Sequence, residues 1–258
     1  MHAAFLSVDL GNSRCKACLS PAQGSTPTTW AADCGPAMAH ELAAWLGSLE
    51  RAGQVALASV ADDVMQRAIL GVLEDWCGRP VPTNPECGLE FDLRQPHGVG
   101  HDRLYAARGA LVRTQGRAAV VVDAGTALTV DAVRPGGAGS AGVFLGGAIA
   151  PGPELAAEAL ARGAARLPRI EPRPGQPALG KDTRGALAAG VGVGFEGAAA
   201  HLVERVAAEA HMPDAAVVLT GGAADYLVEV LTRPGRELCV EPHLVHLGLR
   251  AALGGRPA

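Results

Sequence analysis

Aromatic residues and lysines are scarce in this chain. Phe, Trp and Tyr make up 3% of its 258 residues, and Lys16 and Lys181 are the only lysines among 22 basic residues. Proteins that bind single-stranded nucleic acid stack bases on aromatic side chains. A formal net charge of −4 also offers no general attraction to nucleic acid or to an anionic membrane. We therefore expect no nucleic acid and no membrane among its partners, and a core built from Ala, Val and Leu.

Long apolar runs and disulfide-type cysteine patterns are also missing. No stretch approaches the roughly 18 uninterrupted apolar residues that a membrane helix needs. The first residues, MHAAFLSVDL, lack the charged start of a secretory signal. Six cysteines in a chain of this length do not make a disulfide scaffold, and the single CxxC, Cys15 and Cys18, has no second pair to complete a zinc site. The sequence thus predicts a soluble, cytoplasmic protein with reduced thiols.

The common nucleotide-binding motifs are absent as well. The chain contains no GxxxxGK[ST], which excludes a Walker-type site. One GxGxxG occurs at Gly192, Gly194 and Gly197, but it lies within a helical pattern and not at a strand-to-helix turn, which favours close helix packing. Any nucleotide must be bound in another way.

The chain contains one short pattern, Val-Asp-x-Gly, at two places. Residues 8–19 read VDLGNSRCKACL, and residues 122–133 read VDAGTALTVDAV. In each, an apolar run ends in an aspartate, Asp9 or Asp123, and a glycine turn leads into a second run, which predicts a strand-turn-strand hairpin. Backbone N–H groups at such a turn can cradle a phosphate while the carboxylate holds a hydrated cation. Either hairpin alone fits an ordinary Asp-Gly turn, but two copies favour a phosphate site.

Strand and helix patterns alternate along the chain, which is typical of α/β proteins. Expected strands cover 5–10, 15–19, 55–60, 118–123, 127–133, 143–149, 216–219 and a segment near 239. Expected helices cover 38–52, 62–78, 102–114, 154–162, 183–209, a segment between 222 and 239, and the end from 243. Residues 80–100 and 164–182 are rich in proline and predict loops. We expect two similar domains, 1–113 and 114–258, and the last helix could pack back on the first.

Three further segments accompany the hairpins: GVGHDRLYAARGA at 98–110, GGAIAPG at 146–152 and LTGGAA at 219–224. The hairpins and the LTGG turn resemble the phosphate and adenosine motifs of the sugar-kinase, actin and chaperone ATPase superfamily, whose fold is ribonuclease H-like. Over residues 5–250 the whole chain resembles the type III pantothenate kinase family, which includes the Bvg accessory factor proteins.

This resemblance implies ATP-dependent phosphorylation of pantothenate to 4′-phosphopantothenate, the first step of coenzyme A biosynthesis, with Mg²⁺ and a monovalent cation, K⁺ or NH₄⁺. It assigns Asp123 to the monovalent cation, Asp102 to the role of general base for the pantothenate hydroxyl, and Arg103 to the pantothenate carboxylate. Thr183 matches a threonine that reaches the substrate of the neighbouring subunit, which implies a homodimer with the active site near the subunit interface. The matched residues form an ATP-binding group of Asp9, Leu10, Gly11, Asn12, Ser13, Arg14, Cys15, Lys16 and Thr126, and a pantothenate-binding group of Gly100, His101, Asp102, Arg103 and Thr183.

Two residues depart from the family pattern. Leu93 stands where the family usually has a tyrosine facing the substrate, and Asp182 stands where asparagine is common beside Thr183. Leu93 leaves open a kinase of the same superfamily that acts on another hydroxy acid. The other alternative is a non-catalytic regulatory relative, against which the intact Asp9 and Asp102 argue.

Overall fold

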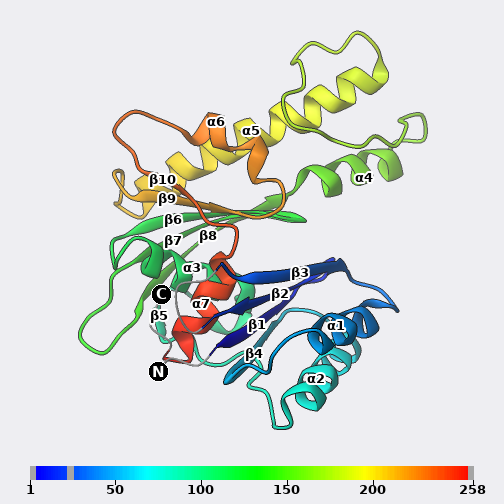
Figure 1. Ribbon diagram of the computed structural model, residues 1–258. Helices are drawn as coiled ribbons and strands as arrows, with labels where there is room; N and C mark the ends of the chain where they lie inside the picture. Colours follow the sequence, from blue (N-terminus) through cyan, green and yellow to red (C-terminus); the bar gives the residue numbers. More distant parts are fainter. Residues whose placement is uncertain (1–3, 22–25, 255–258) are drawn as a thin grey trace.

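The computed structural model describes residues 4–21 and 26–254, which form two β-sheets and the helices around them (Figure 1). The first sheet has the order β3-β2-β1-β4. Its strands are β1 (Phe5–Leu10), β2 (Arg14–Ser20), β3 (Thr28–Asp33) and β4 (Gln54–Ser59). β2 is antiparallel to both β1 and β3, whereas β4 runs parallel to β1. The first expected hairpin is therefore β1–β2.

Two helices cover one face of this sheet. They are α1 (Met38–Gly47) and α2 (Asp63–Cys77). Alternate residues of β1 point to this face, and Leu6 and Val8 pack with Leu42 and Leu73 in one buried cluster. α2 begins cleanly because the Asp62 carboxylate accepts hydrogen bonds from the N–H groups of the first turn.

The second sheet contains six strands in the order β10-β9-β6-β7-β8-β5. They are β5 (Leu89–Phe91), β6 (Ala119–Ala124), β7 (Ala127–Arg134), β8 (Gly142–Pro151), β9 (Ala216–Thr220) and β10 (Leu238–Val240). β6 and β7 form the second expected hairpin. Val120 and Val122 of β6 pack on one side against α5 (Thr183–Glu209), and Val121 points to the opposite side. Both faces of this sheet are thus covered.

Helices α3 (His101–Arg113) and α7 (Leu244–Ala252) lie between the two sheets. One buried cluster joins Phe5 of the first sheet, Tyr105 of α3, Val121 of the second sheet and Leu249 of α7. The two helix backbones cross in direct contact at Gly109 and Gly248. A Cβ atom at Gly248 would overlap the carbonyl oxygen of Tyr105, and one at Gly109 would overlap that of Leu244. Only glycine permits this approach.

A buried histidine attaches α7 to the first sheet. The Ser7 hydroxyl donates to the carbonyl oxygen of Cys18 at 3.2 Å and lies 2.9 Å from Nδ1 of His246. Because that hydroxyl proton is already used, Nδ1–H of His246 donates to the Ser7 oxygen. Burial lowers the pKa of His246 to about 3, so its ring is neutral at physiological pH.

An arm extends beyond the sheets in Figure 1. It consists of α4 (Pro153–Gly163), the loop 164–182 and the N-terminal half of α5. By length and composition α5 could cross a membrane, and 33% of its most apolar 18-residue window is buried. Its C-terminal half packs on the second sheet through Phe195, Ala199 and Val203, as the core helix of a soluble protein does.

Two strands that the sequence did not predict complete the sheets. β3 is an edge strand with mostly half-exposed or exposed residues, TTWAAD, and so lacks a buried apolar run. β5 has only three residues and lies within the segment 80–100 that was expected to be a loop. It pairs with β8 of the second sheet although it comes from the first half of the chain. This pairing crosses the expected domain division at 113/114, and that division stays a prediction.

The helix crossing gives a stability prediction. Gly248→Ala should lower the free energy of unfolding by about 1–3 kcal/mol or more, because the new methyl group must displace the α3 backbone. Denaturant unfolding followed by circular dichroism measures this change. Gly71→Ala in α2 is the matched control, because a Cβ there meets nothing within 4 Å and should stabilise the helix by roughly 0.5–1 kcal/mol. Equal effects of the two variants would contradict the tight crossing.

Candidate active site

The two Asp-Gly hairpins are each closed by a hydrogen bond from the turn glycine, over three residues in the first turn and two in the second. In the first, the Gly11 N–H donates to the Arg14 carbonyl oxygen at 3.0 Å, and in the second the Gly125 N–H donates to that of Ala127 at 3.0 Å. The Thr126 hydroxyl donates to the Ser13 hydroxyl oxygen at 3.1 Å and so joins the two turns. The two turns that carry the repeated sequence pattern therefore lie against each other.

Two more turns line the second hairpin. The turn after β8 is held by a bond from the Gly152 N–H to the Thr126 carbonyl oxygen at 3.0 Å. The LTGG turn after β9 is held by a bond from the Ala223 N–H to the Ala124 carbonyl oxygen at 2.8 Å. Motifs that are far apart in sequence therefore converge on the Asp123 hairpin, where small residues let backbone approach a ligand.

Lys16 interacts electrostatically with two aspartates, Asp9 and Asp123. It is the cross-strand partner of Asp9, and its charge lowers the pKa values of Asp9 and Asp123. Burial is nevertheless the larger effect, and with the nearby carboxylates it raises the pKa of Asp9 to about 7 and that of Asp123 to about 6. A bound cation would relieve this unfavourable confinement of negative charge.

The charged residues of the segment GVGHDR, Asp102 and Arg103, lie in the first turn of α3. The Asp102 carboxylate accepts a hydrogen bond from the Arg103 N–H at 2.8 Å, and a side chain at Gly100 would overlap Oδ1 of Asp102. Asp102 raises the pKa values of Asp9 and Asp123, which places it in the same electrostatic site. His101 lies beside the Tyr105 ring, with ring centroids 6.3 Å apart.

Arg103 makes an ion pair that the sequence did not predict. Its Nε–H donates to Oδ2 of Asp131 at 3.0 Å, and its Nη2–H donates to Oδ1 of the same carboxylate. Asp131 comes from β7, at the end of the DAGTALTVD motif. The motif contained the residue, but no pattern in the sequence indicated that its partner is Arg103.

The remaining matched residues lie in different places. Leu93 packs against the cluster that contains Phe144 and leaves no room for a side chain at Gly146. Thr183 is exposed and begins α5, whose start lies at the outer end of the arm in Figure 1, away from the hairpins. Asp182 caps this helix by accepting a hydrogen bond from the Gly185 N–H at 2.7 Å.

The donor set is suited to cations that arrive with phosphate. Four carboxylates, those of Asp9, Asp102, Asp123 and Asp131, surround the two cationic side chains of Lys16 and Arg103. Within residues 4–21 and 26–254 no group of three or more His, Cys, Asp or Glu residues forms a ready metal cage. Mg²⁺ is usually held by one or two carboxylates together with substrate phosphates. The aspartates present fit that mode.

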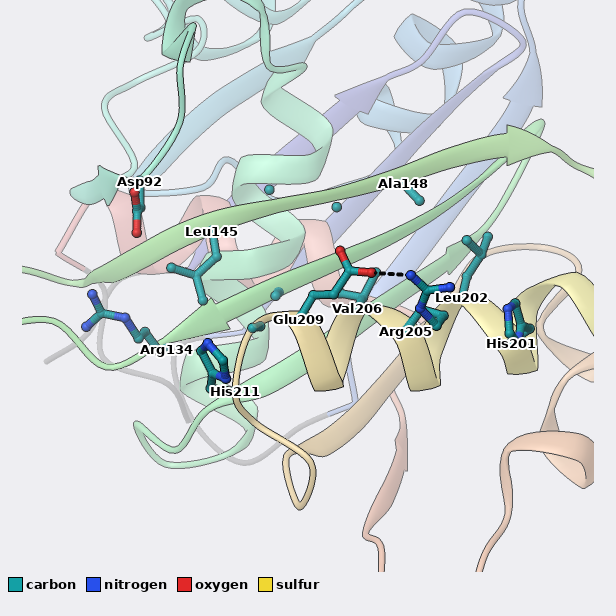
Figure 2. A pocket seen from close by; sticks show the side chains of 14 residues that line it. Asp92, Arg134, Leu145, Ala148, His201, Leu202, Arg205, Val206, Glu209 and His211 are labelled. Atoms are coloured by element: carbon teal, nitrogen blue, oxygen red, sulfur yellow. Dashed lines mark hydrogen bonds and ion pairs between the residues drawn. The ribbon is translucent and has the colours of Figure 1, made fainter.

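A separate open pocket of about 730 Å³ lies elsewhere on the second sheet (Figure 2). It runs along β7 and β8 beside the C-terminal half of α5, and Arg205 and Glu209 form an ion pair on its wall. None of the matched site residues lines it. The convergence of motifs, and not pocket size, therefore identifies the candidate site.

The chain has the fold of the sugar-kinase, actin and chaperone ATPase superfamily, as expected from the sequence. The ethanolamine utilization protein EutJ from Carboxydothermus hydrogenoformans superposes with a TM-score of 0.53 at 18% identity, over 97% of this chain and 89% of EutJ. A Sinorhizobium meliloti protein provisionally named as a 2-dehydro-3-deoxygalactonokinase gives 0.56 at 13% identity, over 96% of this chain and 97% of that protein. At these identities the likeness establishes the fold alone.

Sequence comparison identifies the family. The family model for type III pantothenate kinase matches residues 5–205. A type III pantothenate kinase of Thermus thermophilus is 42% identical over 144 residues, so the aligned stretch spans about half of either chain, 55% of this one and 54% of the relative. One of Halorhodospira halophila is 36% identical over 258 residues, covering 95% of each. The chain belongs to the type III pantothenate kinase family.

The raised pKa values predict that stability depends on pH. Because the pKa of Asp9 is about 7 in the folded protein, above that of an unfolded carboxyl, its ionisation weakens folding as pH rises from about 4 to about 7. In buffer without divalent cations, Asp9→Asn should raise the thermal midpoint at pH 8 by several degrees, at about 2–4 °C per kcal/mol. The gain should shrink at pH 5. Asp75→Asn, at an exposed position of α2, is the matched control, and a gain for Asp9→Asn that does not vary with pH would refute the assignment.

Proposed function

We propose that the protein phosphorylates pantothenate at its 4′-hydroxyl with ATP, giving 4′-phosphopantothenate for coenzyme A biosynthesis. The observation that carries this proposal is the position of Asp102 and Arg103 at the start of α3, within the electrostatic site of Asp9 and Asp123. A proton acceptor and a carboxylate partner thus lie beside two phosphate-type hairpins. Membership of the type III pantothenate kinase family supports the same substrate.

Phosphoryl transfer requires chiefly positioning and neutralisation of charge. In the proposed mechanism the hairpin turns at Gly11 and Gly125 hold the triphosphate through backbone N–H groups, with Lys16 beside them. Mg²⁺ and a monovalent cation at Asp123 would supply positive charge against the triphosphate. Asp102 accepts the hydroxyl proton as the new bond to the γ-phosphorus forms, while the bond from that phosphorus to the bridging oxygen breaks and ADP leaves. Arg103 binds the carboxylate of pantothenate and orients the hydroxyl toward Asp102.

The experiment that tests this function is a coupled assay of ATP consumption with pantothenate, in potassium and in sodium buffer. Asp102→Asn keeps the shape of the side chain and removes the proton acceptor, so kcat should fall about 10²–10⁴-fold. Loss within a factor of about three corresponds to well under 1 kcal/mol and would reject the general-base role. Activity of the wild type on other hydroxy acids but not on pantothenate would favour the different-substrate alternative that Leu93 leaves open.

We also propose that the protein works as a homodimer in the cytoplasm. The arm supports the dimer, because exposed Leu160 and Leu179 give it apolar surface and because α5 begins at the outer end of the arm, away from the two sheets (Figure 1). A second copy could bring its own Thr183 to this site. The six cysteines, all free thiols, fit a reducing compartment.

Sharing of residues between subunits predicts complementation. Asp102→Asn and Thr183→Val variants should each be nearly inactive. Each mixed dimer regains one complete site of two, so purified mixed dimers should have about half of wild-type activity and the unseparated co-expressed protein about a quarter. Mixed dimers purified with two different affinity tags and assayed directly measure this. Mixed dimers that are no more active than either parent would contradict a site shared between subunits.

A further inference from the structure

The guanidinium of Arg103 is already bound along one edge before any substrate is present. Nε–H and one Nη2–H donate to the two carboxylate oxygens of Asp131, with Nε 3.0 Å from Oδ2. This is the bidentate geometry in which arginine binds a carboxylate best. The opposite edge, formed by Nη1 and the second hydrogen of Nη2, is the one that remains for another ligand.

Asp131 is built into the sheet more firmly than an ordinary surface partner. Its side chain is 1% exposed, against 15% for Arg103. The cross-strand neighbour is Gly147, and a Cβ there would overlap Oδ1 of Asp131. β8 thus carries no side chain where the Asp131 carboxylate lies, which leaves that carboxylate room to meet Arg103.

The other contacts of Arg103 reinforce one orientation. Its guanidinium carbon lies 5.6 Å from the centroid of the buried Phe144 ring, which stabilises a cation over the ring face. Burial raises the pKa of Asp131, and the hydrogen bond and charge of Arg103 oppose this rise. Against the effect of burial, the charge of the nearby Asp102 also acts on Arg103 and raises its pKa.

We propose that Asp131 is a positioning residue that fixes Arg103 by its Nε edge, so that the Nη1 edge faces the substrate carboxylate and Asp102 stays free to accept a proton. This proposal rests on the proposed function, because it assumes that Arg103 binds the carboxylate of pantothenate. Asp131 acts through Arg103 and touches no reacting atom. A purely structural ion pair between α3 and the second sheet is the alternative that a test must separate.

The test uses two substrates that differ only at the carboxylate. In pantothenol an alcohol replaces that group, so it does not need the Nη1 edge of Arg103. Asp131→Asn should lower kcat/KM for pantothenate about 10-fold or more relative to kcat/KM for pantothenol, mainly through KM, since hydrogen bonds to charged groups contribute about 1.5–3 kcal/mol. Glu237→Gln, which breaks the surface ion pair with Arg117, is the control and should leave this ratio unchanged.

A second measurement is made on the wild-type protein. In ¹⁵N NMR the Nε–H of Arg103, assigned by its loss in Arg103→Lys, should exchange slowly with water without substrate. It should keep its chemical shift when pantothenate is added, because Asp131 retains that edge. A large shift of the Nε–H on addition of pantothenate means that the substrate displaces Asp131, and overturns the proposal.

The outcomes separate this proposal from the function on which it rests. If wild type does not phosphorylate pantothenate, the proposed function fails before any variant is compared. If wild type is active but Asp131→Asn lowers kcat/KM equally for both substrates, or lowers only the thermal midpoint, the ion pair is structural and the positioning role is refuted. A loss of kcat/KM for pantothenate alone, together with an unchanged chemical shift of the Arg103 Nε–H, supports the positioning role.

Discussion

The backbone contact between α3 and α7 is the constraint on which the site depends. Helices usually pack with their axes about 8–10 Å apart, and glycines at both sides of a crossing allow the closest approach. Gly109 and Gly248 let the two helices share the space between the sheets. α3 is thereby held against both sheets, and its first turn places Asp102 and Arg103 near the aspartates of the two hairpins. A rigid helix start locates a charged pair more precisely than a loop could.

The site gathers more negative charge than the fold would tolerate for stability alone. Burial and mutual repulsion raise the pKa values of Asp9 and Asp123, and the charge of Lys16 opposes the rise at both. Functional sites commonly keep such unfavourable arrangements because the ligand relieves them. The same aspartates that weaken folding at high pH are suited to attract cations, so stability and cation binding are two consequences of one arrangement.

The sequence predicted the hairpins, the main helices and the fold type, because each has a local signal. VDLGNS and VDAGTA combine an apolar run with turn chemistry, and α2 and α5 begin at aspartate caps that are visible in sequence. β3 and β5 were missed because they gain their stability from neighbouring strands and not from their own apolar residues. The pair Arg103–Asp131 was missed for a related reason. Two residues on different elements meet only through the packing of α3 on β7, which no local pattern records.

The presence of Asp131 changes how the site can recognise an anion. Arg103 is paired with Asp131, and Lys16 is shared between Asp9 and Asp123. These two cations therefore offer little net positive charge to an anionic ligand. In the proposed function, recognition then comes from hydrogen-bond geometry at the free edge of Arg103 and at the backbone N–H groups of the hairpins, and cations that bind with the phosphates balance their charge. A pocket of this kind selects by orientation, which is also what an in-line transfer between two bound substrates requires.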